Sequence, residues 1–185
     1  MSFFAVSDEN QEYFDIPAPW GSVRLSLAFE ELWSVAFCLD SPQQTSTNNP
    51  TLSHWAELID AMLQCAEPLT QRARMALFRT RRWQALSPVS RAILERVAVI
   101  PCGRFCTYSH LAEEIGSPKA VRAVGRIMAS NPFPILIPCH RVVSKHMLSA
   151  MDITNPKSFE GTAFGGRPEF VPIGAWLRIN DLTHA

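Results

Sequence analysis

Residues 107–130 read TYSHLAEEIGSPKAVRAVGRIMAS, and this stretch contains two short helical patterns separated by a glycine. The first pattern opens at Thr107-Tyr108 and ends at Gly116. The second opens at Ser117-Pro118, where a cap residue precedes a proline at the first helical position, and it runs to about Ser130. Two helices joined by a tight turn that contains glycine are typical of a helix-turn-helix.

The second of these helices has two distinct faces, because its apolar and its basic residues each recur at helical spacing. The apolar face holds Val121, Val124 and Met128, and the basic face holds Lys119, Arg122 and Arg126. Small residues such as Ala123 and Gly125 leave the helix slim enough to approach a nucleic-acid backbone closely. Three cations on a helix are in general a solvated face, but the basic surroundings favour contact with DNA here.

Charge is distributed unevenly along the chain, although the formal net charge is zero. Residues 1–70 contain ten acidic residues and one basic residue, Arg24, whereas residues 71–145 contain thirteen basic and three acidic residues. This basic middle third indicates a local surface for a polyanion. No apolar stretch is long enough to span a bilayer, and the N-terminus lacks the basic start of a signal peptide, so we expect a soluble protein that stays inside the cell.

The regions before the helix-turn-helix predict an α+β protein. Alternating apolar residues over 23–27 and a further run over 32–37 indicate strands, and a helix capped by Ser53 should follow. An arginine-rich connector over 72–82 then leads to a helix that opens at Ser87-Pro88. The arginines of this connector are explained equally well as phosphate contacts or as a solvated surface.

A cysteine beside a histidine comes after the helix-turn-helix. Residues 133–138 are apolar and bounded by prolines, and they lead directly into Cys139-His140, which indicates a thiol at the edge of a buried pocket. A deprotonated thiol attacks saturated carbon readily, but it needs a base or a positive field to lower its pKa from about 8.5. A buried cysteine beside a histidine is most often a packing residue, so its chemistry depends on its context.

Four motifs follow one another in order between residues 87 and 143. They are residues 100–103 (IPCG), 107–112 (TYSHLA), 116–125 (GSPKAVRAVG) and 131–143 (NPFPILIPCHRVV). Together they resemble the O6-alkylguanine-DNA alkyltransferases, with the spacing of that family. A weaker similarity to the family's small N-terminal β domain covers residues 19–37.

The resemblance implies a fold and an activity. The expected fold is a ribonuclease-H-like sheet-and-helix domain over residues 1–82 and a mostly helical domain over 83–185 with a winged-helix-like helix-turn-helix. The expected activity is the repair of double-stranded DNA that contains O6-alkylguanine, in a single turnover that consumes the protein, with the damaged base flipped out of the duplex. The resemblance implies a monomer without cofactor, metal or membrane attachment, located in the cytoplasm or in the nucleus of a eukaryote.

The resemblance also implies roles for individual residues in the chemistry. Cys139 would accept the alkyl group, and His140 would act on it as a base through a water molecule. Asp181 would stand in the place of the family's glutamate, which orients the histidine. Tyr108 would assist proton delivery to the leaving guanine.

DNA recognition would involve a second set of residues. Arg122 matches the family's arginine that fills the place vacated by the flipped base, and Asn131 matches the asparagine that braces the turn before the active-site segment. The other residues expected to contact DNA or the base are Lys119, Arg126, Ala123, Met128 and Val142.

The sequence departs from the family after Val143. Segment 144–173 is longer than the family's loop at this place, and its aromatic residue is Phe164 rather than a tyrosine. Aspartate at position 181 is a second departure. Both favour an alternative function, that of a relative that binds alkylated DNA without transferring the alkyl group.

Two further alternatives come from other classes of protein. One is a thiol hydrolase that uses Cys139 and His140, although the sequence offers no oxyanion-hole motif. The other is a zinc site that includes Cys102 and Cys106, although no second cysteine pair follows and packing thiols explain this spacing better.

Overall fold

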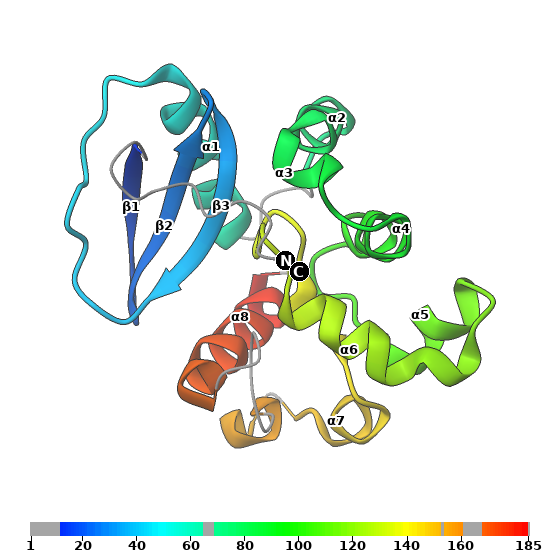
Figure 1. Ribbon diagram of the computed structural model, residues 1–185. Helices are drawn as coiled ribbons and strands as arrows, with labels where there is room; N and C mark the ends of the chain where they lie inside the picture. Colours follow the sequence, from blue (N-terminus) through cyan, green and yellow to red (C-terminus); the bar gives the residue numbers. More distant parts are fainter. Residues whose placement is uncertain (1–11, 65–68, 153, 161–167, 185) are drawn as a thin grey trace.

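The structure, a computed structural model, describes residues 12–64, 69–152, 154–160 and 168–184. Figure 1 shows a small antiparallel sheet with a helix against it on one side of the molecule and a group of helices on the other side. This mixed arrangement of helices and an antiparallel sheet confirms the predicted α+β class at that level. Within the described ranges, none of the helices has the length and apolar character needed to cross a membrane.

The sheet consists of β1 (Tyr13–Ala18), β2 (Gly21–Ala28) and β3 (Glu31–Cys38), in that order and antiparallel throughout. Alternate residues of β2 are buried, as expected for a sheet with one face against a core, and α1 contacts all three strands. Both strands that the sequence predicted, over 23–27 and 32–37, are therefore confirmed.

A buried ion pair joins the first two strands. Asp15 and Arg24 lie opposite each other in the register of β1 and β2, and the guanidinium donates two hydrogen bonds of 2.7 and 2.8 Å to the carboxylate. The backbone N–H of Gln43 donates a third hydrogen bond of 2.8 Å to the same carboxylate. Asp15 is fully buried, so this network fixes the segment after β3 against the sheet.

Helix α1 (Pro50–Leu63) begins earlier than the sequence predicted. Its N-cap is Asn49, whose side chain accepts hydrogen bonds from the backbone of Thr51 and Leu52. The prediction of Ser53 as the cap was wrong, because the Asn-Pro pair before it provides both a better cap and a proline at the first helical position.

The arginine-rich segment 72–82 is helical rather than a connector. It lies in α2 (Gln71–Arg79) and α3 (Arg81–Gln84), which are capped by Thr70 and Thr80. The guanidinium groups of Arg81 and Arg82 lie over the rings of Phe29 and Trp33, at 4.9 and 5.4 Å from the ring centroids. These two arginines therefore pack against the sheet, which accounts for part of the basic run without nucleic acid.

The predicted helix pair is present in the C-terminal half. Helix α4 (Pro88–Val97) is capped by Ser87, and α5 (Tyr108–Glu114) is capped by Thr107, both as expected. After Gly116, which has a φ of +69°, a 3-10 turn η2 (Pro118–Ala120) leads into α6 (Val121–Ala129). Helices α5 and α6 contact each other across this turn.

Two details of the second helix differ from the prediction. The first turn after Ser117 is a 3-10 turn, and the Ser117 side chain makes no capping hydrogen bond. Val121 is 37% exposed, whereas Val124 and Met128 are buried, so the apolar face starts one turn later than predicted. The change from 3-10 to α geometry at residue 121 rotates the first residue of α6 away from the core.

The last part of the chain, from residue 139 on, contacts both the helical half and the half that contains the sheet. The 3-10 turn η3 (Cys139–Arg141) leads into β5 (Val142–Val143), which pairs in parallel with β4 (Cys106–Thr107). The remaining elements are α7 (Lys145–Ala150), η4 (Pro156–Phe159), η5 (Pro168–Phe170) and α8 (Val171–His184). Phe164, the aromatic residue expected in the lengthened loop, lies outside the described residues.

Helix α8 packs against the N-terminal sheet. Trp176 lies edge-on to Trp20 with a centroid distance of 5.1 Å, and Phe170, the last residue of η5 before the helix, lies edge-on to Phe37 at 6.1 Å. The main hydrophobic cluster also contains residues from both sides of position 82. The division into domains 1–82 and 83–185 stays a prediction.

Candidate active site

Cys139 lies at the end of a tight turn that Asn131 holds in place. The Asn131 side chain donates a hydrogen bond of 2.9 Å to the carbonyl of Ile137 and accepts one of 3.0 Å from the N–H of Phe133. Between these two points Ile135 has a φ of +73°, a conformation that is costly for a β-branched residue. The asparagine therefore braces a strained turn, in the place where the sequence predicted it.

The Cys139 thiol is buried, with 8% of the residue exposed. Burial raises the pKa of this thiol above its ordinary value, because the charged thiolate is poorly solvated there. A hydrogen bond from the Asn131 side chain and the positive charge of Arg178 act in the opposite direction. The protein thus supplies specific groups that favour the thiolate in a place where solvent does not.

His140 and Asp181 are in direct contact. Nε2 of His140 lies 3.2 Å from Oδ2 of Asp181, and both residues are buried. Arg141 donates two further hydrogen bonds to the same carboxylate, at 2.6 and 3.0 Å. The sulfur of Cys102 also lies 3.5 Å from Oδ1. The side chain of aspartate is therefore long enough to reach the histidine.

The protonation states of this pair follow from their surroundings. Burial alone raises the pKa of Asp181, but the hydrogen bonds from His140 and Arg141 outweigh it and bring the pKa below its ordinary value. Burial also lowers the pKa of His140, so the imidazole is neutral at neutral pH. A carboxylate at Nε2 selects the tautomer with its proton on that nitrogen, which leaves Nδ1 as an acceptor.

The other ring nitrogen of His140, Nδ1, does not face Asp181. It is buried and has no hydrogen-bond partner among the residues that the structure describes. A buried acceptor without a partner is uncommon and is often functional. It is the nitrogen that a base next to Cys139 would use.

Tyr108 stands at the start of α5, and its side chain is half-buried. Burial raises the pKa of its hydroxyl, the proximity of the Cys139 thiol raises it further, and the charge of Arg178 lowers it. Cys139 thus lies close enough to influence the ionisation of the Tyr108 hydroxyl. That Tyr108 and Cys139 act together in one site stays a prediction.

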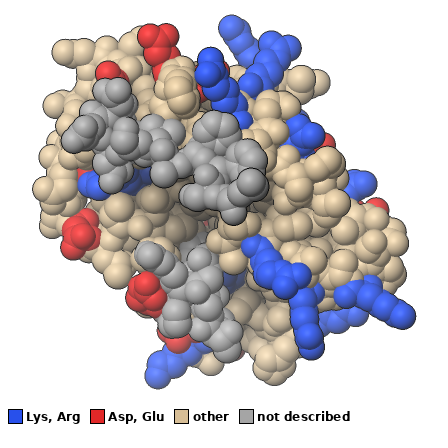
Figure 2. Space-filling model, in the orientation of Figure 1, with Lys and Arg blue, Asp and Glu red and all other residues tan. Residues whose placement is uncertain are grey.

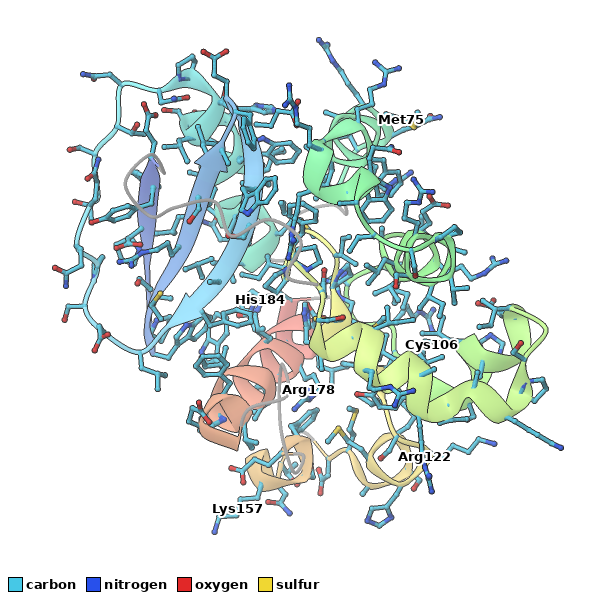
Figure 3. All side chains as sticks on the ribbon, in the orientation of Figure 1. Met75, Cys106, Arg122, Lys157, Arg178 and His184 are labelled. Atoms are coloured by element: carbon cyan, nitrogen blue, oxygen red, sulfur yellow. The ribbon has the colours of Figure 1, made fainter. Side chains whose placement is uncertain are left out.

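Arg178 is a residue of this site that the sequence reasoning missed. It lies on α8 three residues before Asp181, so the two side chains leave the same face of the helix. The residue is only 5% exposed, and Figure 3 shows it on the side of α8 that faces α6 and η4. The spacing from Asp181 was the signal in the sequence that pointed to this position.

The residues expected to contact DNA divide into an exposed group and a buried group. Lys119, Arg122 and Arg126 are exposed on η2 and α6, and Figure 2 shows Lys and Arg side chains gathered over this side of the molecule. Figure 3 shows Arg122 pointing outward from α6. Ala123 is half-buried, whereas Met128 and Val142 belong to the same buried cluster as Cys139. A Cβ placed on Gly125 meets no atom within 4 Å, so the surface of α6 is open there.

Metal-binding groups do not come together in the described part of the chain. Within it, no three side chains of His, Cys, Asp or Glu are placed to hold one ion. The described positions of Cys102 and Cys106 thus give the zinc alternative no support.

Comparison with known proteins finds a family match in the C-terminal half of the chain. Residues 88–154 match the family described as 6-O-methylguanine DNA methyltransferase, DNA binding domain. The methylated-DNA–protein-cysteine methyltransferase of Shigella flexneri is 43% identical over 60 residues, which are 32% of this chain and 35% of that protein. The chain therefore spans about a third of the length of this curated relative.

Solved structures extend the similarity to the whole fold. The crystal structure of the Mycobacterium tuberculosis O6-methylguanine methyltransferase covers 95% of this chain and 94% of its own, with a TM-score of 0.65 and 19% identity. A structure of the M. tuberculosis protein in complex with DNA covers 72% of this chain and 78% of its own, with a TM-score of 0.53 and 23% identity. At these identities the likeness concerns the fold. The sequence match to the 6-O-methylguanine DNA methyltransferase DNA-binding domain covers residues 88–154, and the similarity to solved structures extends the shared fold beyond them.

Proposed function

We propose that this protein repairs DNA by transferring an alkyl group from O6-alkylguanine to the sulfur of Cys139. The contact between His140 and Asp181 beside a buried thiol carries this proposal, because it supplies an oriented base next to a nucleophile. The family of residues 88–154 and the names of the relatives support the substrate class.

The chemical step balances within the residues of this site. The proton of the Cys139 thiol passes through a water molecule to Nδ1 of His140, and the sulfur forms a bond to the alkyl carbon. The bond between that carbon and O6 breaks, and its electron pair leaves with the guanine. The hydroxyl of Tyr108 donates a proton to the departing base and becomes a phenolate. The positive charge that His140 gains with the thiol proton balances the negative charge of this phenolate. The thioether is stable, so each molecule reacts once.

The binding mode follows from the basic residues of η2 and α6. Lys119 and Arg126 would neutralise phosphates, and the small residues of α6 would let the helix approach the minor groove. Arg122 would occupy the space left by the flipped nucleotide. Met128 and the backbone of Val142 would line the pocket for the guanine.

Finer features of the fold belong to the same proposal. We infer that the sheet with α1 is a reduced ribonuclease-H-like unit and that α5, α6 and the β4–β5 pair form a winged-helix-like unit. The protein would act as a monomer, inside the cell.

The direct test is a mass measurement of the intact protein after incubation with duplex DNA that contains O6-methylguanine. Transfer adds the mass of one CH2 unit, since a methyl group replaces a hydrogen, and peptide mapping places it on Cys139. Cys139→Ala should bind the same DNA without gaining mass. Binding without any mass gain in the unmodified chain would instead favour the non-transferring relative, and repeated turnover would favour a hydrolase.

A further inference from the structure

Arg178 is a buried residue of α8, the helix that contacts the active-site turn η3. It shares one face of α8 with Asp181, which contacts both His140 and Arg141 in η3. Helix α8 and η3 are in contact along this face. Because Asp181 touches His140, the residue one turn earlier on α8 lies beside the same short segment, which starts at Cys139.

The guanidinium of Arg178 has a fixed orientation. Its Nε donates a hydrogen bond of 3.0 Å to the backbone carbonyl of Phe159, and Nη2 donates to the same oxygen. Phe159 is fully buried at the end of η4, so the acceptor is itself held in place. Two donors on one planar group that meet one fixed acceptor restrict both the position and the plane of the guanidinium.

The charge of Arg178 is present throughout the neutral pH range. Burial lowers the pKa of the guanidinium to about 10, which still leaves it protonated at neutral pH. This charge acts on the three groups that exchange protons in the proposed reaction. It lowers the pKa of Cys139 and that of Tyr108, and it opposes protonation of His140.

We propose that Arg178 is a positioning residue whose fixed positive charge, held by the Phe159 carbonyl, stabilises the Cys139 thiolate and the Tyr108 phenolate during alkyl transfer. The inference rests on the proposed function, since that reaction creates both anions. When Cys139 loses its proton and when Tyr108 gives one to the base, a negative charge forms in a buried place. A cation that is already oriented stabilises both charges without reorganisation. The same cation keeps His140 in its neutral, proton-accepting form.

The experiment measures the ionisation of Cys139 without DNA. The ultraviolet absorbance of the thiolate is followed against pH, and the curve of the matching Cys139→Ser protein is subtracted, so that the difference reports Cys139 alone. Arg178→Gln removes the charge but keeps an N–H donor for the Phe159 carbonyl. We expect the midpoint to rise by about one pH unit or more in this variant, which is the size of shift that one nearby charge produces. Arg178→Lys keeps the charge and should stay close to the unmodified protein.

Two comparisons separate an electrostatic role from a structural one. Lys157→Gln removes an exposed cation from η4 and should leave the midpoint unchanged. Thermal melting of each variant reports any loss of folding, and Arg178→Lys gives a folded comparison if Arg178→Gln unfolds. An unchanged midpoint in Arg178→Gln, or equal shifts in the Gln and Lys variants, would overturn the proposal.

The outcome is independent of the test for alkyl transfer. A midpoint that depends on Arg178 in a protein that gains no mass from methylated DNA would mean that the charge acts on Cys139 but that the proposed function is wrong. A protein that gains mass while Arg178 has no influence on the midpoint would leave the function standing and remove this inference. In a protein that does transfer, Arg178→Gln should also shift the pH dependence of the single-turnover rate upward.

Discussion

Asp181 on α8 contacts His140 on η3 through Oδ2 and Nε2, 3.2 Å apart, while Arg141 holds the same carboxylate with two hydrogen bonds. The arginine fixes the carboxylate independently of the histidine, so the histidine meets an acceptor that is already oriented. The shorter side chain of aspartate is sufficient because α8 lies close to the turn. One anion thereby sets the tautomer of the base and ties the C-terminal helix to the nucleophile segment.

Replacing Asp181 by asparagine should slow alkyl transfer. The amide can donate a hydrogen bond to Nε2, which moves the imidazole proton to Nδ1 and removes the acceptor beside Cys139. We expect a loss of roughly 10²- to 10⁴-fold in the single-turnover rate, as in other sites where the carboxylate that orients a histidine becomes an amide. The rate is measured with an excess of protein over a methylated duplex.

Asp181→Glu is the matched control, because it keeps the negative charge for His140 and Arg141. It should retain more activity than Asp181→Asn. Wild-type rates in the asparagine variant, with normal folding by circular dichroism, would show that His140 does not depend on this contact.

Asn131→Ala should loosen the turn before Cys139. The variant loses the hydrogen bonds to Ile137 and Phe133, and Ile135 then has less support for its positive φ. We expect the free energy of unfolding to fall by about 1–3 kcal/mol, measured by urea denaturation, since buried backbone groups lose their partners. Asn131→Asp keeps the acceptor for the N–H of Phe133, so its free energy of unfolding should lie between that of the unmodified protein and that of Asn131→Ala. Equal stability of all three proteins would contradict the bracing role.

The local elements could be predicted from the sequence where one short signal sufficed. Caps at Ser87 and Thr107 and the glycine at position 116 set the ends of α4 and α5 from neighbouring residues alone. The alternation of apolar and polar residues in β2 likewise predicted a strand with one buried face. In each case the information lies within one or two turns of the chain.

Other features depend on contacts between distant segments, which periodicity does not encode. Arg81 and Arg82 read as a solvated or phosphate-binding run, yet they lie over aromatic rings of the N-terminal half. Arg178 is hydrophilic on a mostly apolar helix, and only its burial against η4 and η3 brings it into the site. The Ser53 cap failed for a local reason, because a stronger Asn-Pro start lay four residues earlier.

Acid should remove the stabilisation that comes from the Asp15–Arg24 pair. Burial raises the pKa of Asp15, but the hydrogen bonds from Arg24 and the backbone of Gln43 outweigh it, so the folded pKa is lower than the unfolded one. The stabilisation is therefore fully present above the unfolded pKa and is lost as the pH falls through the folded pKa. Asp15→Asn should lower the free energy of unfolding at neutral pH by roughly 1–3 kcal/mol.

The pH dependence distinguishes this ion pair from simple packing. The difference in stability between the unmodified protein and Asp15→Asn should shrink as the pH is lowered below about 4, because protonation of Asp15 then makes the two proteins alike. Denaturation curves at several pH values provide the measurement. A difference that stays constant down to the lowest pH at which both proteins fold would mean that charge is not involved.

Lys119 and Arg126 should contribute to DNA affinity through phosphate contacts. Both are exposed, Lys119 on η2 and Arg126 on α6. Each substitution by alanine should weaken binding to any duplex and reduce the slope of log K against log salt by about 1, because one fewer counterion is released. Fluorescence anisotropy over a series of salt concentrations measures the slope. Lys157→Ala, a change in an exposed cation on η4, is the control and should leave the slope unchanged.

Arg122 should differ from its two basic neighbours by acting on base flipping rather than on general affinity. An arginine that occupies the place of the extruded nucleotide stabilises the flipped state, whereas a phosphate contact stabilises every bound state equally. Arg122→Ala should therefore slow transfer from a methylated duplex by a factor that corresponds to about 1–3 kcal/mol. Transfer from methylated single-stranded DNA should change little, since no stacked duplex has to be opened there. Arg126→Ala, one helical turn after Arg122 on α6, serves as the comparison. It should weaken binding to the duplex and to the single-stranded DNA by similar factors. If Arg122→Ala slowed both substrates equally, or left the duplex rate unchanged at saturating protein, Arg122 would be one more phosphate contact and the flipping role would be lost.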